Sequence, residues 1–106
     1  MPAQENYMNN GYKIYWTDHA LNELAKTIEY LEEHFTDKEI RKLALKIEST
    51  IELIAQNPNI FPKSEYKDIS KAVILKYNTL YYRIKEDSVE ILSFFSNRQH
   101  LAKRKL

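Results

Sequence analysis

The chain of 106 residues contains no cysteine, only one glycine and three prolines. Without cysteine, neither a disulfide bridge nor a zinc–thiolate site can form, which favours a reducing compartment. No apolar run is long enough to cross a membrane, and residues 1–11 lack the cationic start and apolar stretch of a signal peptide. We therefore expect a cytoplasmic protein without membrane association, stabilised by packing alone.

The length fits one domain, and we expect residues 1–11 to be a flexible leader before a single domain over residues 12–106. Charge is unevenly distributed along the chain. Residues 1–65 hold seven Lys and Arg against eleven Asp and Glu, whereas residues 66–106 hold nine against four. The second part would attract an anionic partner, although lysines on strand edges and tails also serve simply to keep a surface solvated.

Branched and aromatic residues crowd together between Lys71 and Gln99, which predicts three consecutive strands in an antiparallel meander. Residues 85–88, Lys-Glu-Asp-Ser, indicate one hairpin turn, and Asn78 marks the earlier one. The apolar side chains expected to support this sheet are Val73, Leu75, Leu80, Tyr82, Ile84, Ile91 and Phe95.

A short strand and two amphipathic helices precede the meander. Residues 12–16 alternate, with Tyr12, Ile14 and Trp16 on one side, as in a strand. Apolar residues then recur at three- and four-residue steps between residues 18 and 56, with one interruption at residues 34–37. Two helices joined by so short a turn are expected to form an antiparallel hairpin.

The helix ends have recognisable signals. Thr17 and Asp18 are suitable N-cap residues for the first helix, and Thr36 with Glu39 has the spacing of a capping box for the second. Pro58 should end the second helix near residue 57. The predicted class is α+β, in the order β-α-α-β-β-β, followed by a basic C-terminal tail.

Three cations, Lys71, Lys76 and Arg83, are spread over the expected strands, where a sheet could bring them together. Such a cluster can hold the phosphates of a nucleic acid or an acidic protein segment. Lysines on exposed strands also discourage aggregation, so the sequence alone leaves these interpretations open.

Arg98 directly follows the last expected strand, so its backbone should be well held and its guanidinium aimed. His100 could serve as a general acid or base, but no partner for it is visible. Neither His19 nor His34 has a second ligand at metal spacing, and we expect no metal site and no cofactor.

The chain resembles the RelE/ParE superfamily of bacterial toxins from type II toxin–antitoxin systems. The residues that carry the resemblance are Lys71 at the start of the meander, residues 80–84 (Leu-Tyr-Tyr-Arg-Ile) and residues 97–99 (Asn-Arg-Gln). The likeness spans roughly residues 12–105. It implies a small growth-inhibiting toxin that a cognate antitoxin neutralises and with which it could form higher-order complexes.

The superfamily divides by mechanism. RelE-like members cut messenger RNA at the ribosome without a metal, and the resemblance would assign that chemistry to Lys71, Arg83, Arg98 and His100. Such members usually present a Tyr-Arg pair early in the middle strand, where this chain has Asn-Thr at residues 78–79. The tyrosine that some nucleases place after the arginine of the last strand, and the usual proline, are also missing.

ParE-like members inhibit DNA gyrase by binding it, and they typically combine a long helical hairpin with an incomplete nuclease set. The departures above favour this branch. The alternatives are a ribosome-dependent RNA endonuclease and a non-toxic binding module of the same fold. The residues expected to engage target and antitoxin are Lys71, Lys76, Arg83, Asn97, Arg98, Gln99, Lys103 and Arg104.

Overall fold

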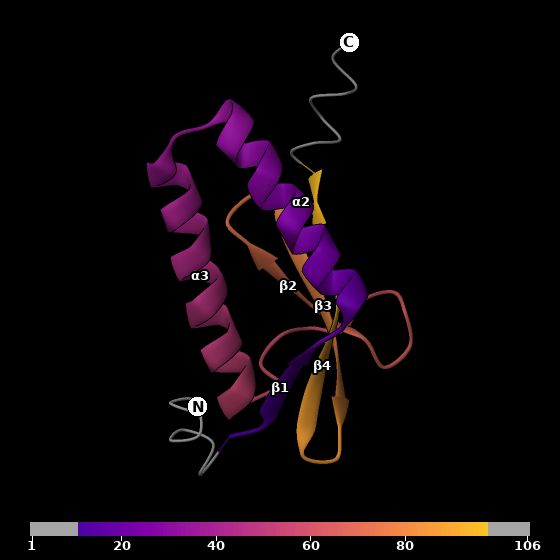
Figure 1. The fold of residues 1–106 in the computed structure, drawn as a ribbon. Helices are drawn as coiled ribbons and strands as arrows, with labels where there is room; N and C mark the ends of the chain where they lie inside the picture. Colours follow the sequence, from indigo (N-terminus) through magenta and orange to yellow (C-terminus); the bar gives the residue numbers. More distant parts are fainter. Residues whose placement is uncertain (1–10, 98–106) are drawn as a thin grey trace.

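The computed structural model describes residues 11–97. Their element order confirms the predicted α+β class and the β-α-α-β-β-β arrangement. Figure 1 shows the two helices joined at one end and lying on one side of the sheet. The elements are β1 Lys13–Trp16, α2 Asp18–His34, α3 Asp37–Gln56, β2 Ser70–Ile74, β3 Asn78–Lys85 and β4 Ser88–Ser96.

The four strands form one mixed sheet in the order β1-β4-β3-β2. The predicted antiparallel meander of β2, β3 and β4 is confirmed. β1 adds to it as an edge strand parallel to β4, with Ile14 opposite Val89. This pairing joins the two ends of the described chain, and no feature of residues 12–16 in the sequence specified it.

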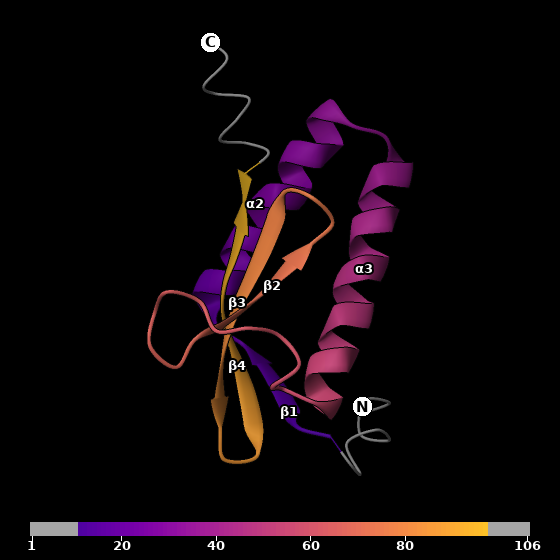
Figure 2. The same ribbon diagram turned by 180° about the vertical axis from the view of Figure 1, so that it is seen from behind.

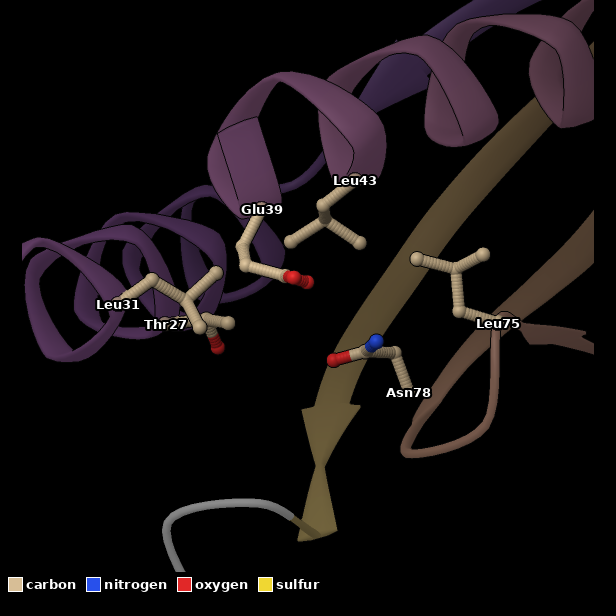
Figure 3. A pocket seen from close by; sticks show the side chains of 6 residues that line it. All are labelled: Thr27, Leu31, Glu39, Leu43, Leu75 and Asn78. Atoms are coloured by element: carbon tan, nitrogen blue, oxygen red, sulfur yellow. The ribbon is translucent and has the colours of Figure 1, made fainter. Parts of the chain in front are cut away.

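The helix starts differ in how they are capped. Thr17 caps α2 as predicted, because its Oγ1 accepts a hydrogen bond from the Ala20 amide at 3.2 Å. The capping box predicted for α3 is wrong, since Thr36 makes no side-chain cap bond. The side chain of Glu39 points instead into a space between the hairpin and the sheet (Figure 3).

The turn between β2 and β3 occupies residues 75–77, one step earlier than Asn78 suggested. Asn78 is the buried first residue of β3, and its Nδ2 donates a hydrogen bond to the Ile74 carbonyl at 3.1 Å. Leu75 takes the left-handed conformation in this turn, with φ 59. The other hairpin turn lies between Lys85 and Ser88, as predicted.

The core lies between the helices and the inner face of the sheet, and its side chains come from alternate strand positions. Two residues of the predicted supporting set do not belong to it, since Val73 is 59 % exposed and Phe95 is 44 % exposed. Their neighbours Ile74 and Phe94 are buried in their place. The buried apolar residues are Ala20, Leu31, Leu43, Ile47, Ile54, Ala72, Ile74, Leu80, Tyr82, Val89, Ile91 and Phe94.

The connection from α3 to β2 is irregular, as its prolines and turn formers predicted. It crosses the side of the sheet that the helices leave open, as the reverse view shows (Figure 2). Across residues 11–97, neither helix is long and apolar enough to span a membrane.

Candidate functional site

The outer face of the sheet, which is the face turned away from the helices, carries the candidate site. Side chains alternate between the two faces of a strand, so burial of Ala72, Leu80 and Tyr82 turns their neighbours outward. The strand register sets outward-facing residues opposite one another. The pairs are Lys71 with Tyr81, Thr79 with Phe95, and Arg83 with Glu90.

An open cavity of about 510 Å³ lies on this outer face. It is large enough for a nucleobase or for an apolar side chain of a partner. Tyr66 meets Tyr81 edge-on at its wall, with ring centroids 6.4 Å apart. The residues that line it are Tyr66, Ile69, Tyr81, Leu92, Ser93 and Phe95.

The loop that supplies Tyr66 and Ile69 is held against the sheet by specific bonds. The buried Tyr82 hydroxyl donates to the Pro58 carbonyl at 2.7 Å, and the Lys71 amide donates to the Pro62 carbonyl at 3.0 Å. Burial raises the pKa of Tyr82 above its ordinary value, so this hydroxyl stays protonated as a donor.

A bulge in β4 shapes the opposite wall. Tyr81 pairs with Ser93 but the next residue, Tyr82, pairs with Ile91, so Leu92 has no partner across the ladder. Leu92 and Ser93, at this bulge, both line the cavity. The bulge also shifts the alternation of β4, which is why Phe94 is buried and Phe95 is not.

Glu23 of α2 fixes the bulge from the helical side. Its carboxylate accepts a hydrogen bond from the Ser93 hydroxyl at 2.6 Å and one from the Phe94 amide at 2.8 Å. His19 lies 3.4 Å from the same oxygen. A carboxylate with two donors in partly buried surroundings holds its neighbours firmly, so α2 contributes to the shape of the cavity on the far side of the sheet.

Partial burial, followed by the negative charge of Glu65, raises the pKa of Tyr81 above its ordinary value. The hydroxyl is therefore a neutral hydrogen-bond donor at physiological pH. With Lys71 opposite it in the register, Tyr81 gives the cavity a polar rim on one side. The remaining lining is mostly aromatic and aliphatic, which suits stacking or apolar contact.

Arg83, a candidate for target binding or catalysis, is held in an ion pair. Its guanidinium donates to Oε1 of Glu90 from Nη2 at 2.6 Å and from Nε at 3.3 Å, and Lys85 Nζ lies 3.8 Å from the same oxygen. The hydrogen bond from Arg83 lowers the pKa of Glu90, and the charge of Lys85 acts in the same direction. The two cations therefore share one carboxylate.

The remaining described candidates lie apart from Arg83. Lys76 is in the β2–β3 turn, with its Nζ 5.6 Å from the centroid of the Tyr77 ring. The amide of Asn97 donates to the Tyr77 carbonyl at 2.7 Å, so Asn97 is beside the same turn. Arg83 lies five positions after Asn78 along β3, a span of roughly 17 Å. Arg98, Gln99, His100, Lys103 and Arg104 lie outside the described residues.

The sequence did not single out Tyr66, Ile69 or Leu92 as site residues. The first two lie in an irregular loop whose path no local pattern specifies, and the third becomes accessible through the bulge. Tyr81 could have been predicted as a site residue from the sequence, because alternation along the strand puts it on the same face as Arg83. Within residues 11–97 no group of three or more His, Asp or Glu could hold a metal ion.

A second, much smaller cavity lies between the helical hairpin and the β2–β3 turn (Figure 3). Its volume of about 10 Å³ admits about one water molecule, which is too little for a substrate. The residues that line it are Thr27, Leu31, Glu39, Leu43, Leu75 and Asn78. The outer face therefore remains the candidate site.

Comparison with solved structures finds the same fold in several bacterial proteins. A chain of the chromosomal ParDE toxin–antitoxin system from P. aeruginosa superposes with a TM-score of 0.68 at 16% identity, and the match covers 80% of this chain and 95% of that chain. YoeB from Staphylococcus aureus, solved as a dimer, gives a TM-score of 0.54 at 19% identity, and the match covers 77% of this chain and 92% of the YoeB chain. The conserved hypothetical protein HP0894 from Helicobacter pylori gives a TM-score of 0.53 at 20% identity, and the match covers 82% of this chain and 96% of the HP0894 chain.

No curated protein sequence matches the chain significantly. A family model does match, over residues 14–101, and it describes the ParE toxin of the type II toxin–antitoxin system parDE. The match takes in the hairpin, the whole meander and the start of the basic tail. The chain belongs to the ParE toxin family of type II toxin–antitoxin systems, and a cognate antitoxin is accordingly its expected partner.

Proposed function

We propose that this toxin arrests growth by binding its target, as a ParE-like inhibitor of DNA gyrase, and that it does not cut RNA. The observation that carries the proposal is the ion pair of Arg83 with Glu90. Metal-free RNA cleavage needs cations free to stabilise charge that develops on the phosphate. Arg83 already has a carboxylate partner, so it is poorly suited to that role.

Residues 78 and 79 support the same conclusion. RNA-cutting relatives usually present a Tyr-Arg pair there, whereas the amide of Asn78 is buried and bonded to the Ile74 carbonyl. Thr79, the outward-facing residue of the two, carries no charge. The middle strand therefore offers no free cation to a phosphate near its start.

Cleavage of messenger RNA is the second candidate, and the cavity favours it. Lys71 lies opposite Tyr81 in the strand register, and Tyr81 lines a cavity that an unstacked base would fill. One lysine with one aromatic platform binds a nucleotide more readily than it cleaves one. RNA cleavage would therefore depend on Arg98 and His100.

Inducing the toxin in a sensitive bacterium separates these functions. Messenger RNA would be mapped for cuts in the ribosomal A site, and chromosomal DNA for gyrase-linked breaks and the SOS response. We expect DNA breaks with intact messenger RNA. RNA cuts without DNA damage would establish the second candidate instead, and normal growth with neither would leave a binding module of the same fold.

The cognate antitoxin, we further propose, covers the outer face with an acidic segment that also carries an apolar side chain. Lys71 would pair with the acid, and the cavity beside Tyr81 would take the apolar group. Lys71→Glu should weaken the complex at least roughly tenfold in a calorimetric titration. Lys13→Glu is the matched control, because Lys13 lies exposed on β1 at the other edge of the sheet. Equal affinities for the two variants would place the antitoxin elsewhere.

A further inference from the structure

The solvent-facing side of α3 carries a basic cluster that lies outside the candidate site. Lys38, Arg41, Lys42 and Lys46 are all exposed in the half of α3 that follows the hairpin turn. Leu45 lies among them and is 62 % exposed, which is the highest value among the exposed large apolar residues of the described chain. An apolar side chain amid four cations is suited to a protein partner rather than to phosphates alone.

The neighbouring half of α2 carries the opposite charge. Glu29, Glu32 and Glu33 are exposed just before the same turn, and the exposed Ala25 lies one turn further back. We call these α2 residues, together with the α3 cluster, the hairpin face. Among the described residues, the salt bridges lie at His19 and between β3 and β4, so none involves the hairpin face.

Each cluster contains like charges that repel one another along its own helix. Lys38, Lys42 and Lys46 repeat at four-residue spacing, as do Glu29 and Glu33, and like charges at this spacing repel. Glutamates in the last turn of α2 and a lysine in the first turn of α3 are also at the unfavourable ends of the helix dipoles. The arrangement makes physical sense if each cluster meets the other on a second molecule.

We propose that a second copy of this chain packs on the hairpin face in a symmetric dimer, with α2 of each copy on α3 of the other. A twofold axis parallel to the helices exchanges α2 and α3 while both hairpin turns stay at the same end. An axis across the helices would instead oppose glutamate to glutamate and lysine to lysine. The charge pattern therefore selects the first axis.

The residues match along that axis. Glu29 lies six residues before Phe35 and Arg41 lies six after it, so the two lie at about the same distance from the turn along their helices. Ala25 and Leu45 lie ten residues from Phe35 on either side, so the exposed leucine of one copy meets the small alanine of the other. An acidic partner of another kind would account for the cations but not for the glutamates.

The contact should be confined to the half of the hairpin near the turn. Figure 1 shows α2 and α3 diverging away from it. At the open end of the hairpin, Asp18 and Glu52 are each seventeen residues from Phe35, so the same packing would place two carboxylates opposite each other. An interface of this limited extent is expected to be weak and sensitive to salt.

Charge reversal provides the test. The toxin would be purified with its antitoxin, released by unfolding, refolded, and studied by sedimentation velocity at low and at high salt. We expect concentration-dependent dimers at low salt, with the dimer Kd raised at least about tenfold in R41E/K42E and also in E29K/E33K. An equimolar mixture of the two variants should restore the dimer, because the reversed α3 of one then faces the reversed α2 of the other.

K63E/K67E is the matched control, since it changes the net charge by the same amount in the loop on the opposite side of the sheet. It should leave the dimer unchanged. A wild-type chain that stays monomeric at low salt would overturn the proposal. So would two reversed variants that fail to associate when mixed while each retains a native circular dichroism spectrum. If R41E/K42E instead weakens antitoxin binding and self-association is absent, the basic cluster binds the antitoxin.

Discussion

The ion pair between Arg83 and Glu90 decides how much positive charge the outer face offers to a partner. Because the Arg83 hydrogen bond lowers the Glu90 pKa below its ordinary 4.5, the unfolded chain takes up this proton at a higher pH than the folded chain. The stabilisation is therefore complete above pH 4.5 and is lost as the pH falls through the lowered value. Glu90→Gln should unfold at lower urea than the wild type at neutral pH, and the difference should shrink as the pH falls below 4.5. Glu86→Gln, in the exposed turn beside it, should show no such convergence.

A buried hydroxyl connects the sheet to the loop that supplies Tyr66 and Ile69 to the cavity. Tyr82 donates to the Pro58 carbonyl at 2.7 Å, and both residues are buried. Tyr82→Phe would leave that carbonyl without its partner and should cost about 1–2 kcal/mol in the free energy of unfolding. Urea titration measures the loss, with Tyr15→Phe as the exposed control. Equal midpoints for the two variants would mean that the loop is held by other contacts.

At the scale of the elements, the two N-caps make a matched pair within one hairpin. Thr17 accepts from the Ala20 amide and also donates to the Ile91 carbonyl at 2.9 Å, so it joins α2 to β4. Thr36 makes no side-chain cap bond. Thr17→Ala should therefore lower the free energy of unfolding by about 1–2 kcal/mol, whereas Thr36→Ala should lower it by less than about 0.5 kcal/mol. A loss at Thr36 as large as that at Thr17 would contradict the difference in capping.

The elements themselves were predictable, but their faces were only partly so. Strict alternation from Lys71 would have turned Val73 outward, where the structure has it, so that error was avoidable. The exposure of Phe95 was not predictable, because it follows from a bulge that Glu23 stabilises from a helix seventy residues away in sequence. The cavity and the ion pair of Arg83 likewise depend on long-range register. Local patterns therefore identified the strands and most of the core, while the site required the assembled sheet.

On the scale of the whole molecule, the helical hairpin covers one side of the sheet and leaves the outer face on the other (Figures 1 and 2). An antitoxin segment beside Lys71 and a second toxin beside Arg41 would therefore not compete for space. Residues 11–97 thus present two surfaces with separate roles. Under the two proposals, the aromatic cavity binds the antitoxin and the charged helical face binds a second copy. Mutating either surface should leave the other intact.

This independence predicts the composition of the toxin–antitoxin complex. If two toxins join through the hairpin face while each binds its antitoxin, R41E/K42E should lower the mass of the saturated complex without changing the ratio of toxin to antitoxin. Lys71→Glu should have the reverse effect, weakening antitoxin binding while leaving the self-association of the free toxin unchanged. Light scattering after size-exclusion chromatography measures the mass of the complex. The ratio of toxin to antitoxin follows from the absorbance of each chain after the two are separated under denaturing conditions. A change in the ratio with R41E/K42E would mean that the antitoxin also contacts α3, and the two surfaces would then act as one.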